Sequence, residues 1–588
     1  MIAVRPPHVV LALVFVAGCP KPDTSGTDTP LDTELDTNPT GDTDTANHGP
    51  VDCAPLHSSI AVTGTPRTIQ FSATIDEGNG PVPTAVNWVI DGPGTIESDG
   101  LYTSPADFGG VARITAVRGT DTALCTVDIE ASVEVNNSGY PAVPEAFAAT
   151  TPTESDACAP DLLYPLANSA MPGSFAPPLI QWQGGGNMYA LELSSQWTTI
   201  WVYTNSTQYQ PPVDAWYGLT HYDPGAAVHL RLAAGNWNGS AFTAGTCMSP
   251  QATDVEVTDG AIDGTIVYWA PPLTKSVTFA QGLPASNEVV NLPGMCDGCH
   301  SVNLAKPSRM AYGPSMPGST NLVDLASPGT VLQSWGGGAE GMKDYGAPDR
   351  SGDYIVVTKM GLITASTMAV YRQDTGALVS AITTARNPTM PNWSPDGTRL
   401  VYAGCDNGGS LMGGSNCDLY VQTWNPTTLA FGGETLIATH PSGQTLYYPT
   451  FSPDSSLVAY NAAVMTPGPD GTITSYANPK AKMMIVGASG GNQLELTAAN
   501  GVGDLTNSWP RWAPAYGTYA WLAVSSKRAY GTQVDGLPQL WVTAIDLDVA
   551  ASGVGDPSKP PTWIPGQLIS EGNHTPTWLP NKDNPPQE

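Results

Sequence analysis

The sequence has few positive charges and almost no long apolar segments. Only 22 residues are lysine or arginine, against 52 aspartates and glutamates, so the formal net charge at pH 7 is −30. Because a surface that binds nucleic acid must neutralise phosphates, this charge excludes nucleic acid as a partner. Beyond the N-terminus, no segment is apolar enough to span a membrane. Helix-period patterning, phosphate-binding glycine loops and clear acid/base carboxylate pairs are also missing.

The residues that are abundant are those of turns and short strands. The chain has 62 glycines and 55 prolines among 588 residues, and its apolar residues mostly alternate with polar ones. Such a chain is too long for one hydrophobic core. We therefore expect an all-β protein with several domains.

The N-terminus has the features of an export signal. Arg5 precedes an apolar run at 9–17 that is too short to span a bilayer, and the run ends in VAGC at Cys19. This ending resembles a bacterial lipobox, which implies a signal peptide at 1–19 and lipidation of Cys19. Because Pro20 is not aspartate, the resemblance implies an outer-membrane lipoprotein, on the periplasmic or cell-surface face. The alternative is an ordinary secretory signal with an incidental cysteine.

Both ends of the mature chain are predicted to be disordered. Residues 20–50 repeat Asp-Thr and contain too few apolar residues to form a core. We interpret them as a self-repelling tether that follows the lipid anchor. The polar tail at 581–588 is expected to be disordered as well.

The cysteine count favours three disulfides. Nine cysteines less Cys19 leave eight, of which two, Cys296 and Cys299, are close neighbours. In an oxidising compartment the other six are expected to pair. The expected pairs bracket two domains and one glycine-rich loop: Cys53 with Cys125, Cys158 with Cys247, and Cys405 with Cys417.

Two β-sandwiches are predicted before the largest domain. Residues 51–132 contain strand-like alternations separated by turn residues, and the segment 94–102 with its GTI and DGLY turns resembles a bacterial Ig-like domain. Residues 157–260 alternate similarly and resemble a fibronectin type III-like module. A polar, proline-rich linker is expected at 133–156. The aromatic residues near Trp197 are interpreted as packing residues, with a carbohydrate surface as the alternative.

Residues 261–580 carry a repeat that predicts the main fold. MPNWSPDG at 390–397 and YPTFSPDS at 448–455 each place a Pro-Asp turn between an aromatic anchor and an apolar strand. The repeats resemble those of TolB-type β-propellers, which implies four-stranded blades. We expect six blades, with five and seven open, and expect strands within 265–281 to share a blade with the C-terminal strand around 574–578.

The segment PGMCDGCHSV contains the pattern C-x-x-C-H at Cys296, Cys299 and His300. This pattern attaches c-type haem, with the two thiols on the porphyrin and the histidine on the iron. The repeat places it at one mouth of the propeller channel. Met390 and His574 start other innermost strands, so either is a candidate sixth ligand. The alternatives are a structural disulfide, zinc or redox thiols, and a five-coordinate haem.

The resemblances set the functional expectation. CDGCHSV also resembles the CVGCHxVSxDG-type segment of secreted bacterial propeller proteins, although the Asp-Gly turn is absent here. The sequence GASGG at 487–491 matches the hydrolase G-x-S-x-G, but no helix or hydrolase domain follows, so no enzyme is expected. We therefore expect a monomeric, lipid-anchored haem c protein for electron transfer or sensing, with a redox or envelope protein partner. The alternative is a non-enzymatic envelope scaffold in which Cys296 and Cys299 are bridged.

Overall fold

The computed structural model describes residues 51–580 with several short gaps. These gaps are 77, 223–224, 226, 259–261, 263, 280–285, 293–295, 303–308, 315–318, 337–342, 360–365, 407–413, 465–476 and 534–535. The predicted signal peptide, the lipidation site Cys19, the tether and the C-terminal tail lie outside the described residues. Within them, no helix has the length and apolar character needed to cross a bilayer.

The first region is built from short strands around one core. Alternate residues of its two longest strands, such as Ile114, Val127 and Ile129, are fully buried. The disulfide Cys53–Cys125 lies in this core, as predicted. The strands are β1 (Val51–Ala54), β2 (His57–Val62), β3 (Thr68–Gln70), β4 (Ser72–Asp76), β5 (Pro81–Pro83), β6 (Asn87–Asp91), β7 (Thr95–Ile96), β8 (Leu101–Thr103), β9 (Gly110–Arg118) and β10 (Asp121–Asn137).

The second region surrounds Trp182, which is fully buried. The predicted disulfide Cys158–Cys247 is present here as well. The elements are α1 (Val143–Ala148), β11 (Thr153–Glu154), β12 (Asp161–Tyr164), β13 (Ser169–Pro172), β14 (Ile180–Gln183), β15 (Met188–Ser194), β16 (Thr198–Thr204), β17 (Gln208–Tyr209), α2 (Val213–His221), β18 (Ala227–Gly235), β19 (Cys247–Met248) and β20 (Thr253–Thr258).

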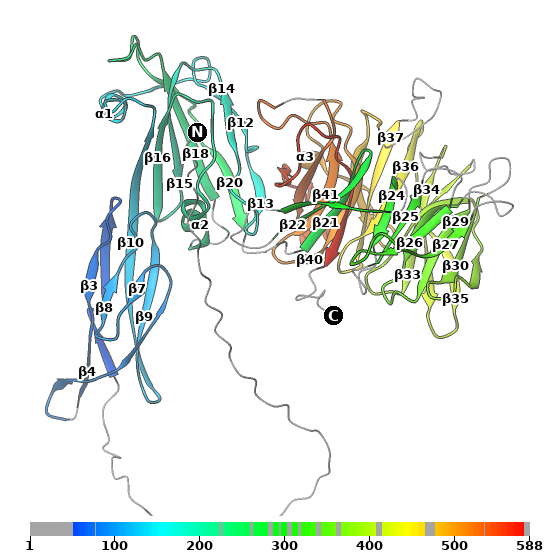
Figure 1. The fold of residues 1–588 in the computed structure, drawn as a ribbon, viewed down its shortest axis with the longest axis horizontal. Coiled ribbons are helices and arrows are strands. Elements are labelled where there is room, and N and C mark those ends of the chain that lie inside the picture. The colour runs from blue at the N-terminus through cyan, green and yellow to red at the C-terminus, as the bar shows by residue number, and fades with distance from the viewer. Residues whose placement is uncertain are drawn as a thin grey trace, which may run out of the picture. The chain divides into compact units, whose positions relative to one another are not determined.

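Strand β10 belongs to both regions (Figure 1). Its first part pairs with β9 and β2, and residues 131–137 pair in parallel with β16. The expectation of a linker at 133–156 is therefore corrected. This segment supplies the end of β10, strand β11 and helix α1, whose Val143 and Phe147 are buried beside Tyr203.

The remaining chain forms six four-stranded antiparallel sheets. Five are sequential: β24 to β27, β28 to β31, β32 to β35, β36 to β39 and β40 to β43. The sixth contains β23, β22, β21 and the C-terminal β44. The expected pairing of the early strands with the C-terminal strand is confirmed, since Ile266 of β21 pairs with Trp578 of β44. GASGG at 487–491 lies between β38 and β39, at the predicted turn.

The bounds of these elements are β21 (Gly264–Ala270), β22 (Leu273–Phe279), β23 (Ser286–Val290), β24 (Cys296–Val302), β25 (Arg309–Pro314), β26 (Ser319–Asp324), β27 (Val331–Gly336), β28 (Lys343–Pro348), β29 (Tyr354–Lys359), β30 (Thr367–Arg372), β31 (Leu378–Ile382), β32 (Asn387–Trp393), β33 (Arg399–Cys405), β34 (Asp418–Asn425), β35 (Ala430–Ala438), β36 (Gln444–Phe451), β37 (Leu457–Val464), β38 (Lys482–Gly487), β39 (Leu494–Glu495), α3 (Thr497–Asn500), β40 (Ser508–Tyr516), β41 (Ala520–Ser526), β42 (Gln539–Ile545), α4 (Leu547–Ser552), β43 (Thr562–Trp563) and β44 (His574–Pro580).

The innermost strands contact one another in cyclic order. Strand β24 contacts β28, and the series continues through β32, β36, β40 and β44 back to β24. Four-stranded sheets whose first strands contact one another in sequence are typical of a β-propeller. It buries one strand of every sheet at the centre and leaves the outermost strand as an edge.

A left-handed residue recurs near the start of several innermost strands. Met390, Tyr448, Trp509 and Thr575 have φ between 49° and 61°, and the strand register shifts beside each of them. Each precedes a proline, a position that normally favours an extended backbone. The bulge turns Met390, Tyr448 and Trp509 into a shared buried cluster with Tyr345.

A polar contact joins each sheet to its neighbour around the ring. In three cases the donor is a tryptophan indole N–H and the acceptor is a backbone carbonyl of the preceding innermost strand. The six contacts are Ser301 Oγ to Gly346 O, Trp393 Nε1 to Ala347 O, Phe451 N to Asn392 Oδ1, Trp512 Nε1 to Thr450 O, Trp578 Nε1 to Arg511 O, and His300 Nε2 to Val267 O. These contacts satisfy backbone or side-chain groups that the sheet interiors bury.

The indole contacts give a testable stability difference. Trp512→Phe removes the donor 3.2 Å from Thr450 O while keeping most of the aromatic volume. We expect it to lower the free energy of unfolding by about 1 kcal/mol, measured by urea denaturation. Trp335→Phe is the matched control, because the buried Trp335 Nε1 has no hydrogen-bond partner among the residues that the structure describes. Equal losses in the two variants would assign the effect to packing.

Candidate functional site

The C-x-x-C-H segment forms the start of β24. The ladder with β25 is regular from His300 onward but shifts register between Cys296 and His300. The side chains of Cys296 and Cys299 lie outside the described residues. The His300 side chain is described: the residue is 3% exposed, and its Nε2 lies 3.2 Å from Val267 O. A carbonyl only accepts, so this contact requires the proton on Nε2, which then has no lone pair for a metal.

The two candidate sixth ligands also have partners within the protein. Met390 is 3% exposed, and its Sδ accepts the N–H of Tyr448 at 3.4 Å. His574 is 8% exposed, and its Nδ1 lies 3.3 Å from Ser525 Oγ. Each of the three predicted iron ligands therefore contacts a different group of the protein. The described part of the chain also holds no group of three metal-binding His, Cys, Asp or Glu side chains.

Burial of the two histidines predicts acid sensitivity. Burial lowers the pKa of His300 to about 4, with the charge of Arg511 adding to the shift and the Val267 contact opposing it. Burial and the charge of Lys527 lower the pKa of His574 to about 3. Since an unfolded histidine titrates near 6.5, the unfolded state binds protons first as the pH falls.

The free energy of unfolding should therefore fall between pH 6.5 and 4, by up to about 1.4 kcal/mol per pH unit for each histidine. Urea denaturation at pH 7.5, 5.5 and 4.5 measures this slope. His574→Gln should remove roughly half of the histidine contribution. An unchanged slope in that variant would show that carboxylates alone set the acid limit.

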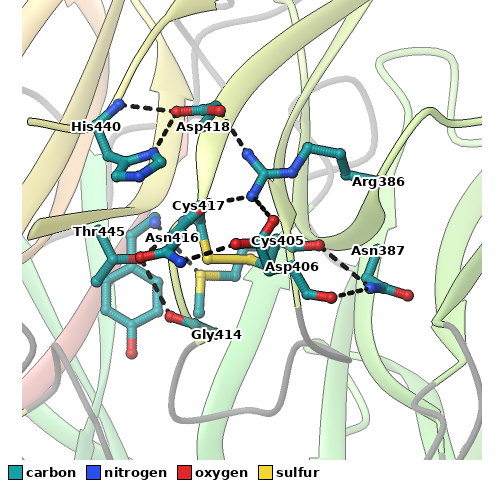
Figure 2. The surroundings of a disulfide bond; sticks show 12 residues. Arg386, Asn387, Cys405, Asp406, Gly414, Asn416, Cys417, Asp418, His440 and Thr445 are labelled. Atoms are coloured by element: carbon teal, nitrogen blue, oxygen red, sulfur yellow. Dashed lines mark hydrogen bonds and ion pairs between the residues drawn. A yellow bond between two sulfur atoms is a disulfide. The ribbon is translucent and has the colours of Figure 1, made fainter. Parts of the chain in front are cut away.

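A second candidate site surrounds the disulfide between β33 and β34. Cys405 and Cys417 are fully buried and bonded, as predicted, with 4.0 Å between their Cα atoms. They join the two ends of the connection 406–417 (Figure 2). Because this disulfide closes a short loop, its larger effect is to hold the two stems of the connection together.

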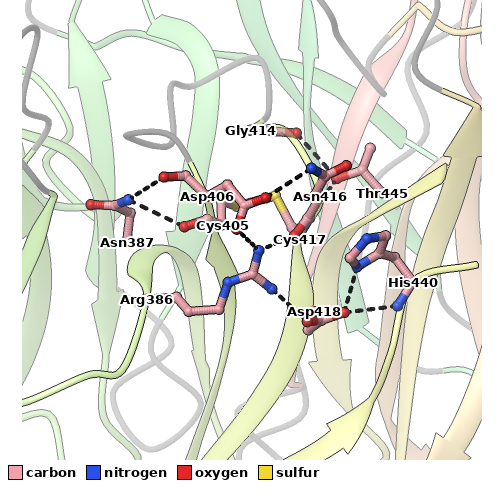
Figure 3. Close-up of polar contacts among 10 residues, drawn as sticks. All are labelled: Arg386, Asn387, Cys405, Asp406, Gly414, Asn416, Cys417, Asp418, His440 and Thr445. Carbon is pink, nitrogen blue, oxygen red and sulfur yellow. Dashed lines mark hydrogen bonds and ion pairs between the residues drawn. A yellow bond between two sulfur atoms is a disulfide. The ribbon is translucent and has the colours of Figure 1, made fainter. Parts of the chain in front are cut away.

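Arg386 ties both stems a second time (Figure 3). Its Nη2 donates to Asp406 on the first stem and to Asn416 O on the second, and its Nη1 donates to Asp418 at the start of β34. Burial opposes the charge on Arg386, but its hydrogen bonds to Asp406 and Tyr420 and the charges of the two aspartates raise its pKa. The hydrogen bonds from Asn416 and Arg386 lower the pKa of Asp406.

Neighbouring residues complete this brace. Backbone N and Nδ1 of His440 both donate to Asp418 Oδ1, at 2.8 and 2.6 Å. Asn387 Nδ2 donates to Cys405 O and Asp406 O, at 3.2 and 2.9 Å. Thr445 Oγ1 donates to Gly414 O and accepts the N–H of Cys417, both at 3.1 Å. The stems are thus held by Arg386 before β32, by Asn387 at the start of β32, and by the chain before and within β36.

The brace lies at the sheet end that carries the long connections. In an antiparallel sheet, the second-to-third strand connection lies at the end where the first strand begins. In three sheets these connections span 406–417, 465–481 and 527–538, whereas the first-to-second strand turns of the same sheets span 394–398, 452–456 and 517–519. The opposite end carries one long connection, 546–561. In these three sheets, the end where the first strand begins therefore has a long second-to-third strand connection every time. Connecting chain on a rigid scaffold is where binding residues concentrate.

Sequence reasoning found the disulfide but missed the charged network. The usable signal was the repeated pair Cys-Asp, at 405–406 and 417–418. It places an acid beside each bonded cysteine, so both carboxylates approach the same point once the disulfide forms. Arg386 gave no such signal, because its contacts with both stems depend on the folded sheet.

Comparison with known proteins leaves the family of this chain open. No protein-family model and no curated protein matches it. Among solved structures, it is similar to TolB from Acinetobacter baumannii, with 14% identity over 63% of this chain and 86% of that one, at a TM-score of 0.35. It is also similar to a putative TolB from Agrobacterium tumefaciens, with 14% identity over 54% of this chain and 99% of that one, at a TM-score of 0.32. Hydrazine synthase from Kuenenia stuttgartiensis is similar as well, with 14% identity over 48% of this chain and 77% of that one, at a TM-score of 0.33.

Proposed function

We propose that this protein is a non-enzymatic binding scaffold of the cell envelope. In this proposal the six sheets are the blades of one closed six-bladed propeller, and the face with the long connections contacts a protein partner. Export and a lipid anchor at Cys19 place the scaffold on the outer membrane. The observation that carries the proposal is the double bracing of the 406–417 stems by a disulfide and by Arg386. Such bracing pre-organises a surface and so reduces the entropy lost on binding.

Two exposed serine or threonine positions test the proposed face. Ser442 lies close to His440 in the connection between β35 and β36, at the end that carries the connection 406–417. Thr427 lies in the turn between β34 and β35, at the opposite end. Both residues are exposed. Envelope proteins of the source cell that bind immobilised wild-type protein are identified, and the affinity of each is measured. We expect Ser442→Arg to weaken the specific complex about 10-fold or more and Thr427→Arg to leave it unchanged. Equal affinities for both variants would refute the proposed face.

Haem c on Cys296 and Cys299, for electron transfer or haem-based sensing, remains the second proposal. The observation that favours it is the register shift between Cys296 and His300, which interrupts regular strand pairing within the motif. Expression with a haem-maturation system tests it directly. A pyridine haemochrome spectrum and a mass increase of one haem, both lost in Cys296→Ala, support attachment. A mass lower by two hydrogens supports a Cys296–Cys299 disulfide instead.

A further inference from the structure

The seam between β24 and the sheet of β21 and β44 lacks the tryptophan found at other seams. In β32, β40 and β44, the indole of Trp393, Trp512 or Trp578 donates to the preceding innermost strand. The register places Val302 at the matching position of β24, since Val302 pairs with Met310 as Trp393 pairs with Leu400. Valine has no side-chain donor. At the two other seams without a tryptophan donor, the polar contact comes from Ser301 or Asn392, so another residue is expected to supply it here.

His300 supplies contacts to both strands across this seam. Its Nε2 donates to Val267 O of β21 at 3.2 Å, and its backbone carbonyl lies 3.5 Å from Thr577 Oγ1 of β44. Val267 and Thr577 are register partners next to a bulge. At the position of His300, the strands β32, β36, β40 and β44 have proline, which has no side-chain donor.

We infer that His300 is a ring-closing residue, whose imidazole takes the place of the missing indole where the last and first sheets meet. This role goes beyond the proposed binding function and does not depend on it. It also explains why the histidine of the motif is buried rather than presented to a metal. Haem attached to the neighbouring cysteines would compete with ring closure for the same Nε2 atom.

Hydrogen exchange of the full-length protein tests this role strand by strand. His300→Leu removes the donor, and we expect backbone amides in β21, β24 and β44 to exchange about 10-fold faster. His300→Gln retains an N–H that can donate to Val267 O, so its exchange should stay within about 3-fold of wild type. Trp512→Phe is the reciprocal control, with faster exchange confined to β36 and β40.

Three outcomes would overturn the inference. The first is unchanged exchange in His300→Leu, and the second is equal acceleration in the Leu and Gln variants. The third is a haem-loaded wild-type protein whose low-spin iron spectrum disappears in His300→Gln. If His300→Leu does not fold, Thr577→Val replaces it: faster exchange limited to β24 and β44 supports the role, and wild-type exchange refutes it. None of these measurements involves the envelope partner, so failure of the binding proposal would leave them unaffected.

Discussion

Replacing both Cys53 and Cys125 with alanine should lower the free energy of unfolding by about 4 kcal/mol. The disulfide joins residues 72 positions apart, so it removes much of the entropy of the unfolded chain. Both cysteines are also buried in the core of the first region. Amide hydrogen exchange of β9 and β10, which form this core, measured at increasing urea, gives the loss.

The control is the double alanine variant of Cys405 and Cys417. The disulfide that it removes closes a loop of only 12 positions. The loop-closure entropy predicts a smaller loss there, about 3 kcal/mol. Amides of β33 and β34 should report that loss in the same exchange experiment, while the midpoint for β9 and β10 should not change. A larger loss from the short loop than from the long one would contradict the entropic argument.

Arg386→Met should destabilise the brace by about 2–3 kcal/mol and expose the connection 406–417 to proteolysis. The substitution leaves Asp418, whose side chain is 12% exposed, with no guanidinium partner. The hydrogen bonds from His440 to Asp418 Oδ1 remain, but Oδ2 loses its cation at a depth where water does not replace it, which is costly. Thermal denaturation measures the loss of stability. Limited proteolysis measures the exposure, with the cut sites mapped by mass spectrometry. The protease must not be trypsin, because the substitution removes a trypsin site.

The double variant Arg386→Met with Asp418→Asn separates charge from packing. It removes the unpaired carboxylate, so we expect it to recover about half of the stability lost in the single variant. Cleavage at 406–417 should remain faster than in wild type, since Asp406 and Asn416 O still lack their common donor. Identical stabilities for the single and double variants would mean that Asp418 does not depend on Arg386.

The strands and disulfides could be predicted because their signals are local. A Pro-Asp turn after an aromatic anchor marks the hairpin at 394–398, and the structure has β32 and β33 on either side of it. The pairing of the C-terminal strand was predictable because the first sheet otherwise lacked an innermost strand. The linker at 133–156 was predicted from its polar, proline-rich composition. That prediction overlooked Val133 and Val135, which continue the alternating pattern of β10 into the polar segment.

The site could be predicted only in part, because its contacts are not local. The motif at 296–300 identified His300 as unusual, but its partner Val267 lies in another sheet. Met390 was expected at the channel mouth, and its left-handed backbone turns it toward Tyr345, Tyr448 and Trp509, which lie in the innermost strands of three other sheets. Neither the bulge nor the resulting burial is visible in a residue that simply precedes a proline.

The shared strand β10 gives the first two regions a common path for mechanical load. A pull on residue 51 reaches Cys53, crosses the disulfide to Cys125 and enters β10, which hydrogen-bonds along its length to β2 and β16 in parallel. Parallel strands pulled along their axis must break many hydrogen bonds at once. The chain between Cys53 and Cys125 is bypassed, so tension from the N-terminal side would be borne by the covalent bridge and β10 while that chain stays unstretched.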